Sequence, residues 1–115
     1  MPHIRLKSIT CHQPDETDKD EIYLIFQGKK IWPKNVKFLR IDAGENIKID
    51  LDLQFASGWA DVELWEYDFW SKNDHLGNFY LKADNYKGEY TNELDENSHV
   101  SERAKYSLHW EILAS

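Results

Sequence analysis

The feature that most constrains this chain is the strict alternation of apolar and polar side chains between residues 47 and 55. Every odd position in this stretch is apolar, and every even position is lysine, aspartate or glutamine. Successive side chains of a β-strand point to opposite faces, so the pattern predicts a strand with one face in a core and the other in water. Residues 104–112 repeat the alternation. Nowhere in the sequence do apolar residues recur at the spacing of an amphipathic helix.

Shorter alternating or apolar runs, separated by turn residues, fill the rest of the chain. The expected strands span residues 4–10, 21–26, 30–41, 47–55, 61–67, 76–81, 90–94 and 104–112. The polar residues 95–102 are expected to be mobile. Many short strands with frequent turns are typical of folds in which two sheets pack together. We therefore predict an all-β fold, an eight-stranded antiparallel β-sandwich, in a single domain over residues 1–115.

The charge of the chain limits its partners. With 14 Lys and Arg against 21 Asp and Glu, the formal net charge is −7. No face rich in lysine or arginine is visible, so we expect no binding to nucleic acid. An anionic membrane would also repel the chain, unless a bound cation reverses the local field.

The sequence contains no stretch that we interpret as a targeting signal. No apolar run follows Met1, and no stretch approaches the roughly 20 apolar residues of a membrane span. Cys11 is the single cysteine, so no disulfide can form within the chain. We expect a cytoplasmic protein, with export by a signal-independent route left open.

Three carboxylates fall within a short span between two of the predicted strands. Glu66 and Asp68 stand at the end of the strand 61–67, and Asp74 precedes the next strand. Residues two apart on a strand point to the same side, so Glu66 and Asp68 are expected to converge. Like charges at that range repel, whereas several oxygen donors around one point suit a hard cation such as calcium.

This span resembles the third calcium-binding loop of the C2-domain family. The family pattern is an acid, any residue, an Asp, five residues, another Asp, and then an apolar residue and a Gly. The matching residues, without gaps, are Glu66, Asp68, Asp74, Leu76 and Gly77, with Glu66 standing where the family usually has Asp. C2 domains are β-sandwiches that bind calcium in loops at one end, and many dock on phospholipid. The resemblance therefore implies a divergent C2-like protein, for which we expect a bacterial source.

A second acidic cluster extends the resemblance. The first loop of the family carries an Asp, and then another Asp just before a buried strand that contains a Tyr. Here Asp20 precedes Tyr23, and Asp15 lies five positions before Asp20, with Glu16 and Asp18 as alternatives to Asp15. The calcium ligands that the resemblance implies are Asp15, Asp20, Glu66, Asp68 and Asp74.

The two acidic clusters can share a site only if their loops lie at the same end of the sandwich. That requires an even number of strands between them. The expected intervening strands are 21–26, 30–41, 47–55 and 61–67, which is an even number. The count holds if Pro33, which has no N–H to donate to a ladder, bends one strand. If Pro33 forms a hairpin instead, the clusters lie at opposite ends.

Phe69 and Trp70 stand in the loop between Asp68 and Asp74. In one interpretation they form an apolar tip that contacts a membrane or a partner once calcium neutralises the acids. In the other, one or both rings fold back onto the core. The sequence leaves both interpretations open.

The leading hypothesis is a non-enzymatic, calcium-binding C2-like module that docks on an anionic membrane surface or a protein partner. One alternative is a metal-independent interaction or assembly module, for instance an immunity-type β-sandwich. Another is a carbohydrate-binding module, which two coplanar exposed tryptophans would favour. Zinc is not expected, because the five histidines form no close pair. Catalysis is not expected, because Glu66 and Asp68 stand too close for a glycosidase pair and no Ser/Cys-His constellation is recognisable.

Overall fold

The structure, a computed structural model, describes residues 1–100 and 103–114. The strands are β1 His3–Gln13, β2 Asp20–Phe26, β3 Lys29–Trp32, β4 Leu39–Ile41, β5 Asn46–Gln54, β6 Trp59–Glu66, β7 Asp74–Lys82, β8 Gly88–Glu93, β9 Asp95–Glu96 and β10 Lys105–Ala114. The described part of the chain forms no helix, and hence none long and apolar enough to cross a bilayer.

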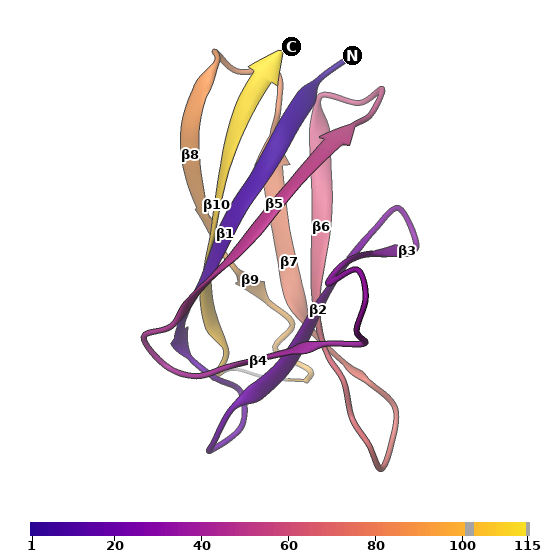
Figure 1. The fold of residues 1–115 in the computed structure, drawn as a ribbon, viewed down its shortest axis with the longest axis vertical. Helices are drawn as coiled ribbons and strands as arrows, with labels where there is room; N and C mark the ends of the chain where they lie inside the picture. Colours follow the sequence, from indigo (N-terminus) through magenta and orange to yellow (C-terminus); the bar gives the residue numbers. More distant parts are fainter. Residues whose placement is uncertain (101–102, 115) are drawn as a thin grey trace.

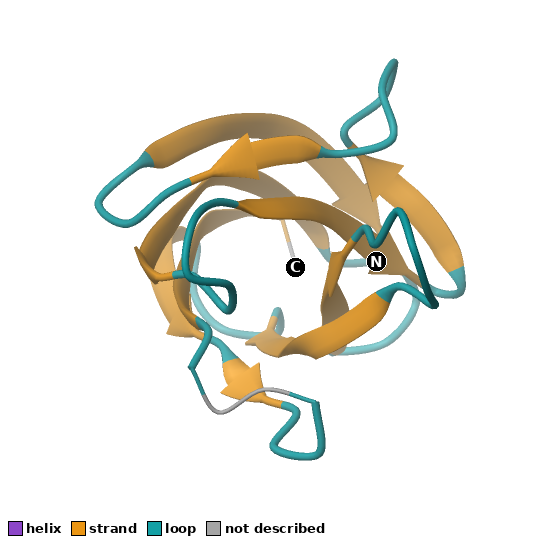
Figure 2. Cartoon of the chain, turned by 90° about the horizontal axis from the view of Figure 1, so that it is seen from below, coloured by secondary structure: helices purple, strands orange, loops and turns teal. Residues whose placement is uncertain are grey.

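The strands form two antiparallel sheets that pack face to face (Figure 1). A four-stranded sheet has the order β5-β1-β10-β8, and a six-stranded sheet has the order β3-β2-β6-β7-β9, with β4 also paired to β2. Seen from one end, the two sheets curve around a common interior (Figure 2). Trp110, Tyr106 and Phe79 are the largest fully buried side chains in that interior. The predicted antiparallel β-sandwich is therefore confirmed.

The predicted strand 30–41 is interrupted after Trp32 without reversing direction. β3 and β4 both pair antiparallel with β2, β3 near its C-terminal end and β4 near its N-terminal end. Pro33 follows β3 directly, at a point where a residue without an N–H cannot continue a ladder. The chain therefore passes along one edge of β2 in two pieces, and of the two alternatives left open at Pro33, the structure shows the bend and not the hairpin.

The remaining extra strand lies in a stretch that we expected to be mobile. β9 pairs with β7 through Gly77 opposite Glu96 and Asn78 opposite Asp95. A Cβ at Gly77 would lie 2.3 Å from the carbonyl oxygen of Asp95, so glycine permits this close approach. Residues 95–102 were expected to be mobile, but Asp95 and Glu96 form a strand. The last two residues of that stretch, 101–102, lie outside the described residues. With β9 and the split after Trp32, the described chain has ten strands where eight were predicted.

The sequence of the first predicted strand, residues 4–10, suggests a plain alternation, and the structure departs from it beyond Leu6. The register of β1 shifts between Leu6 and Ser8 relative to both of its neighbours. Such a bulge changes which positions face inward. The buried positions pass accordingly from Leu6 to Ile9 and Cys11.

Candidate metal centre

The loops 14–19 and 67–73 lie at the same end of the sandwich, the lower end in Figure 1. The first connects β1 to β2, and the second connects β6 to β7. They meet because β2 pairs with β6, with Ile22 opposite Glu66. Just beyond that pair, the amide of Tyr67 donates a hydrogen bond of 2.8 Å to the carbonyl oxygen of Glu21. The two acidic clusters thus share one end, as the even number of strands predicted.

Glu66 is the last residue of β6, and its side chain points into the sandwich. It follows Leu64 in the alternation that buries every second residue of β6, and it is 1% exposed. Neither carboxylate oxygen of Glu66 receives a hydrogen bond from the described residues. A buried polar group without a partner costs about 1–3 kcal/mol, and a charged one costs more. Glu66 is therefore a buried carboxyl group whose ionised form is costly in the surroundings that the described residues provide.

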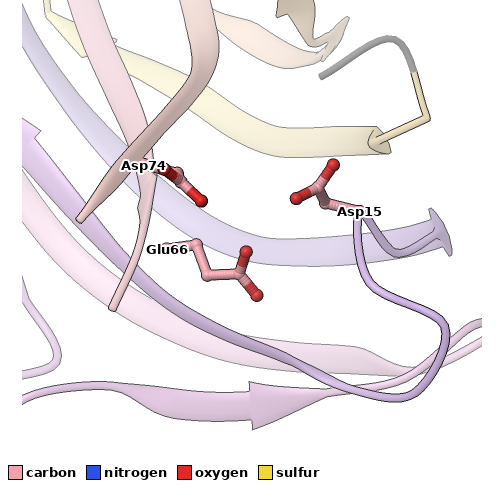
Figure 3. A group of neighbouring side chains, drawn as sticks. All are labelled: Asp15, Glu66 and Asp74. Carbon is pink, nitrogen blue, oxygen red and sulfur yellow. The ribbon is translucent and has the colours of Figure 1, made fainter. Parts of the chain in front are cut away.

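Two further acids face Glu66. Asp15, from the loop 14–19, and Asp74, the first residue of β7, each place a carboxylate oxygen within 4.8 Å of one oxygen of Glu66 and of one another. The three side chains gather around a common space (Figure 3). Glu66 also belongs to a second group, in which Glu16, Glu21 and Glu66 each place a carboxylate oxygen within 4.8 Å of the other two. Glu66 thus lies at the centre of the acids at this end.

Burial and neighbouring acids raise the pKa values of Glu66 and Asp74. The pKa of Glu66 lies well above its usual range, because the side chain is buried and because it faces the charge of Asp20. Burial, and then repulsion from Asp15 and Asp68, raises the pKa of Asp74. Ionising these two carboxyl groups therefore costs free energy, and a bound divalent cation would offset that cost.

Asp20 is as deeply buried as Glu66, but its carboxylate is well supplied with donors. Its Oδ1 accepts from the amide of Glu16 at 3.0 Å. Its Oδ2 accepts from the amide of Asp15 at 2.8 Å and from the hydroxyl of Tyr106 at 2.5 Å. Asp20 belongs to neither acid group found among the described residues. Asp20 was predicted to be a calcium ligand, but its carboxylate binds the backbone of the loop 14–19.

Asp68 lies beyond the end of β6 and bonds within its own loop. Its Oδ1 accepts from the amides of Trp70 at 2.8 Å and Ser71 at 3.2 Å, and its Oδ2 accepts from the Ser71 hydroxyl at 2.8 Å. These bonds lower the pKa of Asp68, with the Trp70 amide contributing most. Asp68 therefore stabilises the turn of the loop, and the structure does not bring it into the described acid groups with Glu66.

The two aromatic residues of the loop 67–73 behave differently. Phe69 packs edge-on against the rings of Phe38 and Tyr67, with centroid distances of 5.6 and 5.1 Å. It is still 59% exposed, whereas Trp70 is 95% exposed. Phe69 thus folds back, though onto surface rings rather than the core, and Trp70 projects into solvent.

Three residues that shape or extend the centre were not predicted. Asn73 accepts from the Asp68 amide at 2.9 Å and donates to the Tyr23 hydroxyl at 2.8 Å. Its place directly before Asp74 was an available signal. Glu21 directly follows Asp20, which was a signal of the same kind. Tyr106 is 86 positions from Asp20 in the sequence, and no local pattern links the two.

Comparison with known proteins does not assign this chain to a family. No protein-family profile matches the chain, and no curated protein matches it. Among solved structures, the chain is similar to a C2 domain of plant Extended Synaptotagmin 1, with 13% sequence identity and a TM-score of 0.47. That match covers 95% of this chain and 90% of the other. The β-sandwich assignment itself rests on the strand pairing of this chain. The expected bacterial source stays a prediction.

Proposed function

We propose that this chain is a non-enzymatic calcium-binding β-sandwich module of the C2 type, with Asp15, Glu66 and Asp74 as protein ligands. The observation that carries the proposal is the carboxylate of Glu66, which is buried, receives no hydrogen bond from the described residues and faces two further carboxylates. Burying an acid in this way is costly unless a cation is present to pair with it.

The donor set suits calcium. All members of the two acid groups are carboxylates, and hard oxygen donors favour calcium over zinc or copper. Calcium takes about six to eight oxygen ligands. Asp15, Glu66 and Asp74 supply part of that shell, and Glu16 and Glu21 lie beside it. The remaining positions are open to water, to loop carbonyl groups or to the oxygen of an external ligand.

The proposed mechanism is an electrostatic switch. Without calcium, the acids of the two loops repel one another and repel any anionic surface. A bound cation removes that repulsion and draws the loops 14–19 and 67–73 together. Its open coordination positions then accept a phosphate or carboxylate oxygen, so that calcium and the anionic ligand bind together.

The proposed docking surface is an anionic membrane. Trp70 projects from the same loop that ends at Asp74, and it is 95% exposed. A tryptophan ring suits the boundary between lipid headgroups and acyl chains. With calcium between the loops, Trp70 and Phe69 would enter that boundary while the cation contacts a phosphate or carboxylate of the headgroup.

The carbohydrate alternative is disfavoured by the positions of the exposed tryptophans. Trp59 is 55% exposed at the start of β6, and Trp70 lies in the loop after its end. A strand of that length separates its ends by roughly 23 Å, which is too far for one sugar platform. The metal-independent interaction module remains the competing outcome of the test below.

Calorimetric titration with calcium, followed by sedimentation with vesicles, tests the proposal. We expect the wild type to bind calcium with a dissociation constant of about 10⁻⁶ to 10⁻³ M. Asp74→Asn should weaken binding, whereas Asp84→Asn, an exposed acid just after β7, should not. Calcium should then carry the protein onto vesicles of phosphatidylserine and phosphatidylcholine, but not onto phosphatidylcholine alone.

Two results separate the alternatives. Calcium binding without vesicle binding favours a protein partner over a membrane. The absence of any calcium binding contradicts the proposal and leaves the metal-independent module.

A further inference from the structure

The loop 14–19 is anchored by a tyrosine from the opposite sheet. Tyr106 lies on β10 of the four-stranded sheet and is 1% exposed. Its hydroxyl reaches across the interior to Oδ2 of Asp20, at the start of β2 in the six-stranded sheet. A tyrosine ring packed in a core has little freedom, so its hydroxyl is a fixed point.

Asp20 in turn holds the loop 14–19 through hydrogen bonds from two backbone amides. Its two oxygens accept the amides of Asp15 and Glu16, which are consecutive residues of the loop 14–19. The Asp15 side chain is one of the three that gather in Figure 3. A chain of hydrogen bonds therefore runs from the core, through Asp20, to the backbone of a residue in the proposed cation site.

We propose that Tyr106, acting through Asp20, is a positioning residue for the cation site, and that it holds the loop 14–19 so that the carboxylate of Asp15 faces Glu66 and Asp74. This inference rests on the proposed function. It gives Asp20 the role of an anchor, in place of the ligand role implied by the resemblance. Residues that orient metal ligands in this way commonly affect affinity by about 10-fold to 100-fold.

Calcium titration of Tyr106→Phe tests the inference. The substitution keeps the buried ring and removes only the hydroxyl. Tyr90→Phe is the matched control, because the Tyr90 hydroxyl donates to the carbonyl of Tyr86, away from the acids. At a temperature well below either melting point, Tyr106→Phe should bind calcium about 10-fold more weakly than the wild type, and Tyr90→Phe should bind like the wild type.

The same titration separates the anchor from a ligand role of Asp20. If Asp20 binds calcium directly, removal of the Tyr106 hydrogen bond frees an oxygen lone pair for the metal. Tyr106→Phe would then bind calcium as tightly as the wild type or more tightly, and that result would overturn the inference alone. A wild type that does not bind calcium would overturn the proposed function and this inference with it.

Hydrogen exchange without metal supplies a readout that a general loss of stability would not produce. The amides of Asp15 and Glu16 should exchange more slowly in the wild type than those of Thr17 and Asp18, which have no acceptor among the described residues. Tyr106→Phe should speed exchange at Asp15 and Glu16 selectively. Equal exchange at all four amides of the wild type would overturn the inference, even if the variant did not fold.

Discussion

Acids are common both on the outer face of the four-stranded sheet and at the loop end of the sandwich. On the sheet face they pair with basic side chains, whereas at the loop end they lie close to other acids. On the sheet face, Asp52 pairs with Arg5 at 2.7 Å, and Glu89 pairs with Lys7. The hydrogen bond from Arg5 lowers the pKa of Asp52. The sheet face therefore balances its charge within the chain.

At the loop end, acid faces acid. Asp15, Glu66 and Asp74 place carboxylate oxygens within 4.8 Å of one another. The pKa of Glu66 is raised, chiefly by burial, whereas that of Asp52 on the sheet face is lowered. Glu21, beside these acids, is paired with Arg40 at 3.8 Å. Under the proposed function, the charge that balances Asp15, Glu66 and Asp74 comes from a bound cation, and the following predictions test this difference between the two regions.

The largest expected effect is that of calcium on thermal stability. At a hundredfold excess over its dissociation constant, calcium should stabilise the folded chain by about 2.7 kcal/mol. For a domain of this size, that corresponds to a rise in Tm of roughly 10 °C. Differential scanning calorimetry in calcium and in chelator measures the shift. Identical melting curves would mean that the loop end needs no external charge.

The second prediction concerns Glu66→Gln in chelator. Removing an unpaired buried acid should raise the free energy of unfolding at neutral pH by about 1–2 kcal/mol, while the stabilisation by calcium disappears. Glu63→Gln is the matched control, because Glu63 lies on the same strand with its side chain on the other face, where it accepts from Trp65 Nε1 at 2.8 Å. Urea denaturation of both variants measures the difference. Destabilisation by Glu66→Gln in chelator would contradict the contrast.

The third prediction is that stability falls as the pH rises in chelator, and that saturating calcium removes this fall. Because the folded-state pKa of Glu66 is raised above its ordinary 4.5, its protonation contributes stability below that pH. This contribution is lost as the pH rises toward the folded-state pKa, by at most about 1.4 kcal/mol per pH unit. Calcium requires the ionised form, so stabilisation by calcium should grow over the same range.

Denaturation between about pH 5 and about pH 8 measures these slopes. Asp52 on the sheet face is the comparison for Glu66, because its pKa is lowered from 3.8. Its contribution is present above that value and is lost only as the pH falls through the lowered pKa, outside the measured range. An equally steep fall in stability in saturating calcium and in chelator would show that Glu66 does not bind the cation.

The smallest expected effect on stability is that of Trp70→Ala. A side chain that is 95% exposed makes few contacts, so the free energy of unfolding should change by less than about 0.5 kcal/mol. Calcium affinity should also stay unchanged, while sedimentation with anionic vesicles falls. Trp59→Ala, at the other end of β6, is the control. Equal vesicle binding by Trp70→Ala and Trp59→Ala would contradict the proposal that Trp70 contacts the membrane.

Much of this fold could be predicted from the sequence because it depends on local patterns. The alternation in residues 47–55 follows from strand geometry. The missing N–H of Pro33 predicted an interruption there, but the pairing with β2 decided between a bend and a hairpin. The bulge after Leu6 could not be predicted, because a register shift depends on the neighbouring strands β5 and β10.

The same division holds for the candidate site. The spacing of Glu66 and Asp74 was a local signal, and the structure brings the two together across a strand pair. The surroundings of Asp20 were not a local signal, because its donor Tyr106 comes from a distant strand in the other sheet. Sequence spacing therefore identified acids near the site, but it could not separate those that face one another from those already supplied with donors.

The most direct measurement is the electron density at the loop end in crystals grown with and without calcium. We expect a calcium ion with carboxylate oxygens of Asp15, Glu66 and Asp74 at about 2.3–2.6 Å, and no such ion in chelator. Crystals grown in calcium in which the Glu66 carboxylate still contacts no cation would contradict the account.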